Sequence, residues 1–151
     1  MNEMSPARAD ALPFDAAKLD DLMERAGIDA LVVSSKHNLR YLLGGYQFFF
    51  FAHFDAIGLG RYVPMLVYPR RGAARAAYIG NPMEKWERDN DRFWVPDVQP
   101  AAWYPADSMR LAVAHLLRLG LATRRIAVER SFLPADAAEV LQTGLPHAEI
   151  V

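Results

Sequence analysis

The side chains best suited to chemistry gather in residues 45–61, where a run of aromatic rings surrounds His53, Asp55 and Arg61. A histidine and a carboxylate can transfer protons, and an arginine can hold an anionic substrate. An independent small-molecule enzyme is therefore one hypothesis. Polar residues this close in sequence more often form a loop than a site, so this hypothesis ranks behind the two developed below.

The histidines do not form a recognisable metal site. None of them is four residues from another, and no HExxH arrangement occurs, so we expect a structural or surface role for each. The chain has no cysteine, which excludes disulfides, thiolate catalysis and cysteine-ligated metals and fits a reducing compartment. The four histidines are His37, His53, His115 and His147.

Other catalytic motifs are missing as well. The glycines of residues 44–45 and 58–60 form neither a GxGxxG motif nor a Walker loop, and no serine lies in a GxSxG elbow. We therefore predict no catalytic residue and no metal ligand in this chain. The acidic residues are expected at helix starts and on solvated helix faces, as for Asp20, Asp21, Glu24, Glu84, Glu87 and Asp89.

Length and composition indicate one ordinary soluble domain. The chain has 151 residues, of which 52% are apolar and 23% charged. Its net charge of -1 gives no surplus of basic residues for nucleic acid. No secretory signal is present at the N-terminus, and no apolar run approaches the roughly 18 residues of a spanning helix. We predict a cytoplasmic protein that binds neither nucleic acid nor membrane.

Apolar spacing and capping residues predict three long helices, which start after Asp15, after Asp107 and at Pro134. Glycines at positions 27, 120 and 144 are expected at or after their ends. A shorter helix is predicted over residues 82–90, where Asn81 and Glu84 form a capping box. The first helix should bury one stripe, formed by Leu19, Leu22, Met23 and Ala26.

Short apolar runs between these helices predict strands. Residues 62–68 and 74–79 are joined by a turn and indicate an antiparallel hairpin, although Pro64 disfavours a central position for the first of them. Helices that alternate with strands, together with one hairpin, predict an α/β domain with a mixed sheet. The other predicted strands are residues 28–33, 93–95, 125–129 and 148–151. Because the last of these has no polar tail, the chain looks cut from a longer one.

Two segments resemble the N-terminal domain of the creatinase/prolidase family, which includes Xaa-Pro aminopeptidases, Xaa-Pro dipeptidases and creatinase. Residues 19–33 (LDDLMERAGIDALVV) and 38–46 (NLRYLLGGY) match the opening helix, strand and loop of that domain. Residues 125–135, which include RIAVE and FLPA, and residues 145–151 resemble its closing strand, helix and strand. Between them the two matches frame nearly the whole chain.

The resemblance implies a ribonuclease H-like three-layer α/β domain with a mixed β-sheet flanked by helices. This domain would cover residues 14–151, with residues 1–13 as an N-terminal tail. Proteins of the family also carry a C-terminal catalytic metallopeptidase domain with two divalent metal ions, and the resemblance implies that this domain is absent here. A nuclease is not implied, because Asp29 stands alone on its strand.

Our leading hypothesis is the non-catalytic N-terminal domain of a Xaa-Pro peptidase or creatinase-like metal-dependent hydrolase. Such a domain would contribute to oligomerisation and cover the active site, with its own C-terminal catalytic domain and a second copy of the chain, in a homodimer, as partners. We predict that the chain alone is inactive and binds no cofactor. The alternative is a stand-alone small-molecule or protein binding module that uses the same fold.

In creatinase, an aromatic residue and an arginine from the segment after the NLRYLLGGY match reach the neighbouring subunit's substrate. By resemblance, the candidates here for substrate contact in trans are Phe50, Phe51, His53 and Arg61.

The aromatic run itself allows two interpretations. A strand with one buried face should alternate, so four consecutive phenylalanines would place rings on both faces. The run is either a doubly covered segment inside the core, or a loop or edge that the parent enzyme buries against another domain or subunit. We favour the second interpretation, which predicts that several of these rings are exposed in the isolated domain: Phe48, Phe49, Phe50, Phe51 and Phe54.

Overall fold

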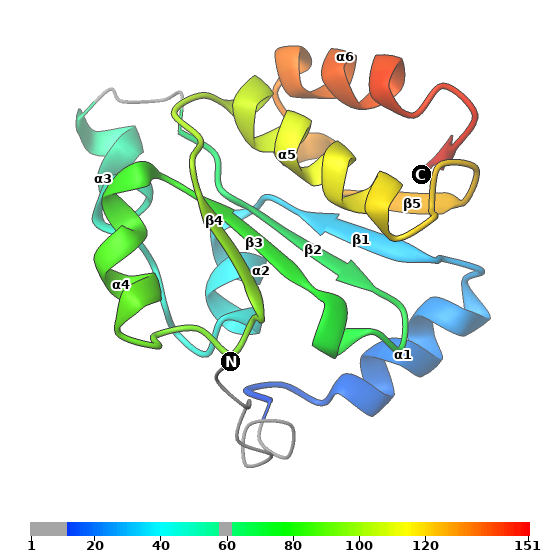
Figure 1. The fold of residues 1–151 in the computed structure, drawn as a ribbon, viewed down its shortest axis with the longest axis horizontal. Coiled ribbons are helices and arrows are strands. Elements are labelled where there is room, and N and C mark those ends of the chain that lie inside the picture. Colours follow the sequence, from blue (N-terminus) through cyan, green and yellow to red (C-terminus); the bar gives the residue numbers. More distant parts are fainter. Residues whose placement is uncertain (1–11, 58–61) are drawn as a thin grey trace.

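The structure, a computed structural model, describes residues 12–57 and 62–151, although the side chains of residues 54–57 are not described. A six-stranded mixed sheet lies between two layers of helices (Figure 1). This arrangement confirms the predicted α/β class and its three layers. The predicted tail, residues 1–13, lies almost entirely outside the described residues.

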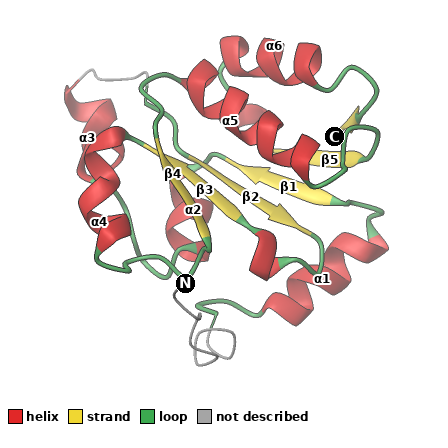
Figure 2. Ribbon diagram, viewed as in Figure 1, coloured by secondary structure: helices red, strands yellow, loops and turns green. Residues whose placement is uncertain are grey.

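The sheet has the strand order β4-β3-β2-β1-β5-β6. The strand β2 runs antiparallel to both of its neighbours, which confirms the predicted hairpin of β2 and β3. All other neighbouring strands are parallel (Figure 2). The strands are β1 (Ala30–Val33), β2 (Met65–Pro69), β3 (Ala77–Gly80), β4 (Asp97–Pro100), β5 (Arg125–Val128) and β6 (Glu149–Ile150).

The helices begin where the sequence offers caps. The side chain of Asp15 accepts a hydrogen bond from the Lys18 amide at the start of α1, and Ser35 caps α2 in the same way. Asn81 and Glu84 form the predicted capping box. The α-helices are α1 (Ala16–Arg25), α2 (Lys36–Leu42), α3 (Phe49–Ile57), α4 (Lys85–Asp89), α5 (Pro105–Arg118) and α6 (Ala135–Gly144), and the 3-10 turns are η2 (Ala73–Arg75), η3 (Pro82–Glu84) and η4 (Arg130–Phe132).

The two faces of the sheet bury two separate apolar cores. Because successive strand residues point to opposite faces, Met65 and Val67 of β2 enter one core and Leu66 and Tyr68 enter the other. The first core packs against α5 and α6, and the second packs against α1, α2 and α3 (Figure 1). The sheet is therefore covered on both sides, as its parallel pairs require.

The chain leaves the adjacent parallel strands β1 and β5 in opposite directions. After β1 it turns to α2 on one face of the sheet, and after β5 it turns through η4 to α6 on the other face. The carboxyl ends of two such strands form a crevice where ligands often bind in α/β proteins.

Three local predictions are wrong. Residues 93–95 are not a strand, because Phe93 and Val95 instead enter the core and the Trp94 indole nitrogen donates to the Leu42 carbonyl at 2.7 Å. Pro64 does not keep β2 from the centre of the sheet, because the strand begins one residue later. On α1 only Met23 is fully buried, and Leu22 is exposed since the stripe that meets the sheet is narrower than the sequence suggests.

Candidate functional site

Most of the aromatic run lies in a helix, α3, so the run is neither a strand nor a loop or sheet edge, while its burial against another domain or subunit stays a prediction. Side chains along a helix are about 100° apart, and Phe49, Phe50 and Phe51 therefore point in three directions. Phe51 points into the core and is 4% exposed, whereas Phe49 is 60% exposed. Phe48 and Phe50 are half-buried, so the expected exposure of several rings is met in part.

The structure separates the predicted substrate-contacting residues. Phe51 packs against Tyr62 with ring centroids 6.2 Å apart, on the inner side of α3. His53 is exposed, with Nδ1 3.1 Å from the Phe49 carbonyl oxygen. Phe50 lies between these two environments, half-buried. Arg61, like the Asp55 side chain of the third hypothesis, lies outside what the structure describes.

Phe49 is among the rings predicted to be exposed, although it is not one of the substrate-contact candidates. Its ring lies 4.7 Å from the His53 ring, centroid to centroid, because residues four apart are neighbours on a helix. A helical reading of the run would have paired these two residues. The outer surface of α3 thus presents an apolar ring beside a histidine.

A cavity of about 440 Å³ opens at the carboxyl ends of β1 and β5. One wall follows β1 and carries serine hydroxyls together with a lysine and a histidine, and the other wall follows β5 and is mainly apolar. Phe51 of the second core and Val63 of the first core complete its lining. The lining residues are Ser34, Ser35, Lys36, His37, Phe51, Val63, Ser131, Phe132, Leu133 and Pro134.

Glu129 ties the two sides of this crevice together. Its Oε2 accepts hydrogen bonds from the Ser34 and Ser35 amides, both at 2.7 Å. Its Oε1 accepts from the Ser35 hydroxyl at 2.6 Å and from the Asn38 amide group. Burial alone would raise the pKa of Glu129, but these hydrogen bonds outweigh it and hold the pKa below its usual value. The backbone amides just before α2 are thus bound by a carboxylate of the protein itself.

A second carboxylate, Glu84, is fully buried at the end of η3. Its Oε1 accepts from the hydroxyls of Tyr46 at 2.7 Å and Tyr78 at 2.8 Å. Its Oε2 accepts from the Tyr62 hydroxyl and from the Asn81 amide, the latter at 2.6 Å. The expectation that Glu84 lies on a solvated face is wrong, because η3 turns it toward the second core.

Burial dominates the electrostatics around Glu84. It raises the pKa of Glu84 above the usual value, while the four hydrogen bonds that the carboxylate accepts oppose this effect. Burial and the nearby negative charge also raise the pKa of Tyr46 and Tyr62, so both phenols stay protonated and donate at neutral pH.

Gly80 leaves the space that this carboxylate needs. A Cβ at position 80 would lie 2.2 Å from Glu84 Oε2 and 2.9 Å from a ring carbon of Tyr78. Both distances are shorter than any side chain tolerates, so the close approach requires glycine.

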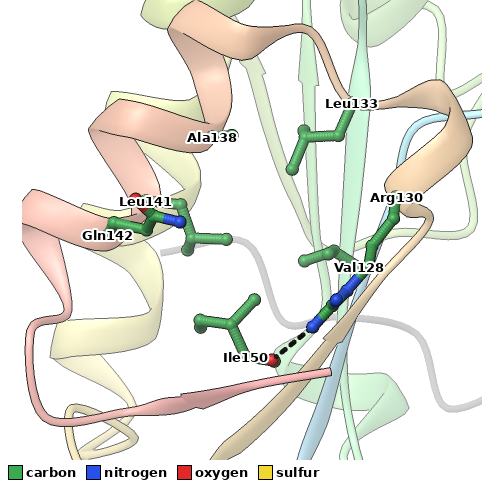
Figure 3. Close-up of a pocket in the computed structure, with 7 residues that line it drawn as sticks. All are labelled: Val128, Arg130, Leu133, Ala138, Leu141, Gln142 and Ile150. Atoms are coloured by element: carbon green, nitrogen blue, oxygen red, sulfur yellow. Dashed lines mark hydrogen bonds between the residues drawn. The ribbon is translucent and has the colours of Figure 1, made fainter.

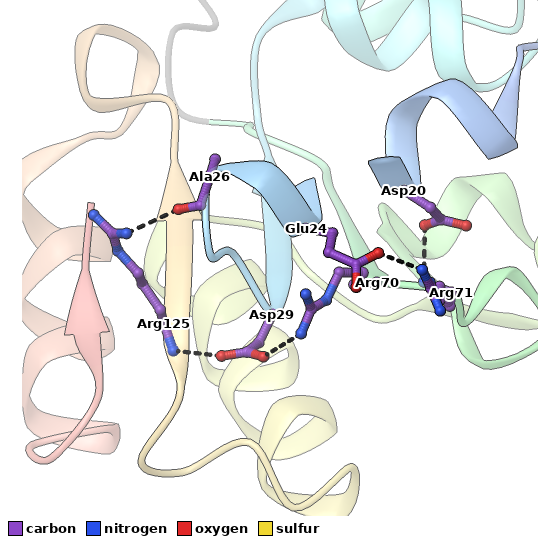
Figure 4. Close-up of polar contacts among 7 residues, drawn as sticks. All are labelled: Asp20, Glu24, Ala26, Asp29, Arg70, Arg71 and Arg125. Carbon is purple, nitrogen blue, oxygen red and sulfur yellow. Dashed lines mark hydrogen bonds and ion pairs between the residues drawn. The ribbon is translucent and has the colours of Figure 1, made fainter. Parts of the chain in front are cut away.

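The carboxylates at the other end of the sheet hold structural contacts (Figure 4). Asp29 accepts from Arg70 Nη2 and from the Arg125 amide, both at 3.1 Å. Arg71 pairs with Glu24, and its amide donates to Asp20 at 2.8 Å. Asp29 is thus a structural residue, as its isolation in the sequence suggested.

A smaller cavity of about 280 Å³ lies between α6 and the strands β5 and β6 (Figure 3). Leu133, Leu141 and Ile150 make its apolar lining. Arg130 Nη2 donates to the Ile150 carbonyl at 3.0 Å and closes one side. This cavity contains no pair of groups suited to proton transfer.

Among the side chains of residues 12–53 and 62–151, no group of three or more histidine or acidic residues is placed to hold a metal ion. His115, one of the four scattered histidines, is buried, and its Nε2 lies 2.8 Å from the Arg75 carbonyl oxygen. In the same part of the chain, no helix is long and apolar enough to cross a membrane.

Solved structures share this fold. A proline dipeptidase from Streptococcus pneumoniae TIGR4 matches with a TM-score of 0.64 and 19% identity, over 90% of this chain and 88% of that chain. The N-terminal domain of the cytoplasmic peptidase PepQ from Mycobacterium tuberculosis H37Rv matches with a TM-score of 0.62 and 18% identity, over 97% and 92%. A prolidase from Thermococcus sibiricus matches with a TM-score of 0.67 and 12% identity, over 99% of this chain and 35% of that chain.

No curated protein matches the sequence. A family model described as the Creatinase/Prolidase N-terminal domain, in contrast, matches residues 16–151, from the first residue of α1 to the last residue of the chain. Both segments in which the sequence resembles that family lie within this range. With nearly the whole described fold matched in sequence and in structure, the chain belongs to the creatinase/prolidase N-terminal domain family.

Proposed function

We propose that this chain is the non-catalytic N-terminal domain of a Xaa-Pro peptidase or creatinase-like metal-dependent hydrolase. The observation that carries the proposal is the family match over residues 16–151. The prolidase from Thermococcus sibiricus supports it, because the matching domain makes up about a third of that chain. The partners in this proposal are a C-terminal catalytic domain, which holds two divalent metal ions, and a second copy of the chain.

In this proposal the outer surface of α3 helps to cover the active site or joins two subunits. Phe49 supports this role, because burying a ring that is 60% exposed against a partner favours association. His53 beside it can add a hydrogen bond to a substrate or a partner. A cytoplasmic location is part of the same proposal.

The catalytic half of the proposal is tested with the chain alone and a Xaa-Pro dipeptide, in the presence of manganese, cobalt or zinc ions. We expect no cleavage above that of the metal salts, because the metal ligands belong to the other domain. The complete reading frame, expressed in parallel, should cleave the dipeptide. Robust metal-dependent cleavage by the chain alone would contradict the proposal.

The interface half is tested by sedimentation of the complete protein with Phe49→Ser. We expect this change to weaken the dimer or to raise KM, since it removes an exposed ring from α3. The matched control is Leu117→Ser, because Leu117 is 48% exposed on α5 in the opposite layer. If both variants or neither of them change assembly and KM, α3 is not the covering surface.

A stand-alone binding module is the second candidate, and the cavity at the carboxyl ends of β1 and β5 favours it. A volume of about 440 Å³ lies in the usual range for small-molecule sites, and the crevice lies where such sites occur in α/β folds. The downstream reading frame separates the candidates. Continuation into a domain with paired aspartate and glutamate ligands supports the first, and a stop codon after Val151 supports the second.

A further inference from the structure

The helix α3 lies in an excursion of the chain between β1 and β2, residues 46–62, which begins and ends at a tyrosine. Tyr46 precedes α3 by three residues, and Tyr62 lies between the helix and β2. Their hydroxyl groups both reach Glu84, Tyr46 on Oε1 and Tyr62 on Oε2. One buried carboxylate therefore links the two ends of the excursion.

All the acceptor positions of Glu84 are used. An ionised carboxylate offers about four lone-pair sites, and here Tyr46, Tyr62, Tyr78 and the Asn81 amide each donate to one. A capping box alone needs only the bond to the Asn81 amide, for which glutamine serves as well as glutamate. The other donors are three tyrosines, two of which flank α3, so the contacts of this carboxylate exceed those of a helix cap.

Tyr62 connects Glu84 to α3, because its hydroxyl binds the carboxylate and its ring contacts the helix. Its ring packs against Phe51 at 6.2 Å and against Phe48 at 6.1 Å, centroid to centroid. These two residues are nearly one helical turn apart, so the Tyr62 ring contacts the inner side of α3 around its first turn. Tyr62 therefore contacts both Glu84, through its hydroxyl, and α3, through its ring.

We propose that Glu84 is a positioning residue that fixes α3 by holding Tyr46 and Tyr62, and that it thereby sets the orientation of the Phe49 and His53 surface. Tyr78 binds the same carboxylate from β3, a strand of the sheet, and its ring meets the Tyr46 ring edge-on with centroids 6.2 Å apart, a contact that Tyr78→Phe leaves in place. Two of the three tyrosines thus orient the helix, and the third holds the carboxylate. The consequence for a substrate rests on the proposed function, but the positioning itself does not.

The test is hydrogen exchange on the chain, measured in peptides that cover residues 47–57. Domains of this fold have been crystallised on their own, as for the N-terminal domain of PepQ. We expect Tyr46→Phe and Tyr62→Phe each to speed exchange in α3 about tenfold, as for loss of a hydrogen bond to a charged group. One such amide is that of Ala52, which bonds to the Phe48 carbonyl.

Tyr78→Phe is the matched control, since it removes one hydroxyl from the same carboxylate and leaves the aromatic ring in place. We expect it to leave exchange in α3 within about twofold of the unchanged chain, and exchange in β2 should be the same in all three variants. Equal acceleration of α3 by Tyr78→Phe and Tyr62→Phe would overturn the proposal. So would unchanged α3 exchange in both Tyr46→Phe and Tyr62→Phe.

Kinetics of the complete enzyme separate the positioning of α3 from its role in catalysis. If α3 covers the active site, Tyr62→Phe should raise KM for a Xaa-Pro dipeptide about tenfold and leave kcat within about twofold, while Tyr78→Phe changes neither. Faster α3 exchange with unchanged KM supports the positioning role and contradicts the covering role. Unchanged α3 exchange contradicts the positioning role whatever the kinetics show.

Discussion

Glu84 and Glu129 have the same hydrogen-bonding pattern in opposite surroundings. Each carboxylate accepts from four donors, two on each oxygen, and within the described part of the chain neither is paired with a lysine or an arginine. Glu84 lies fully buried at the end of η3, whereas Glu129 is half-buried at the crevice between β1 and β5. The pKa of Glu84 is raised, and that of Glu129 is lowered.

The difference shows that the number of hydrogen bonds does not decide the direction of a pKa shift. Removing a carboxylate from water favours its neutral form, and donors favour its charged form. At Glu129 the donors prevail because water still reaches the group, and two of the donors are backbone amides. At Glu84 burial prevails although the donors are equally many. The two residues therefore respond differently to the same substitution.

The largest effect is expected from Glu84→Gln. A carboxamide keeps one oxygen but turns two N–H groups toward hydroxyls and an amide that already donate, so buried donors lose their acceptors. We expect a loss of about 3 kcal/mol in the free energy of unfolding, measured by urea denaturation at neutral pH. As a control, Glu139→Gln changes an exposed carboxylate on α6 and should cost less than about 0.5 kcal/mol. A loss at position 84 no larger than this control would contradict the burial argument.

Glu129→Gln should have a smaller effect, about 2 kcal/mol, in the same measurement. The carboxamide again replaces an acceptor with a donor, but water can reach the half-buried group and satisfy part of what is lost. If Glu129→Gln costs more than Glu84→Gln, burial is not what separates the two carboxylates.

Ser35→Ala should cost about 1 kcal/mol. The hydroxyl of Ser35 caps α2 by accepting from the Asn38 amide at 3.3 Å, and it donates to Glu129 at 2.6 Å. Combining this change with Glu129→Gln tests whether the two act together. We expect the double variant to lose less than the sum of the single losses, and strict additivity would indicate that the Ser35–Glu129 bond contributes nothing.

The smallest effect is the pH dependence of these losses, which should have opposite signs. The folded-state pKa of Glu129 lies below the usual 4.5, so its contribution to stability is present above pH 4.5 and is lost as the pH falls through the lowered value. The folded-state pKa of Glu84 lies above 4.5, so its contribution is present below pH 4.5 and is lost as the pH rises through the raised value.

Unfolding of both glutamine variants and the unchanged chain between about pH 3 and pH 8 measures this difference. The cost of Glu129→Gln should shrink as the pH falls, and the cost of Glu84→Gln should shrink as it rises. Parallel trends for the two variants would show that the carboxylates titrate alike.

Local signals in the sequence predicted most of the elements correctly. The Asp15 cap, the Asn81 capping box and the strand at residues 125–129 all depend on neighbours a few residues away, and all are present. The aromatic run was misread because four consecutive phenylalanines have neither a helical nor a strand period. In the structure the run packs against Tyr62, and the tyrosines on either side of α3 bind Glu84.

At the candidate site, too, the local sequence predicted only part of what the structure shows. The resemblance pointed to the segment after residue 46, and α3 lies there, but Phe51 turned out to be buried and Phe49 exposed. Glu84 was recognised as a cap, although nothing within four residues reveals that Tyr46 and Tyr62 also bind it. Only its role as a helix cap depends on residues close to it in the sequence.

The sequence by itself determined the α/β class, the order of most elements and the family, because caps, apolar periods and framing motifs are properties of short segments. Only the tertiary structure decided which carboxylate is buried, that Phe49 faces water while Phe51 does not, and which strands border the crevice. The physical reason is distance along the chain. The donors of Glu129 lie 91 to 95 residues away, and those that anchor α3 to Glu84 lie 38 and 22 residues away, so folding alone brings them together.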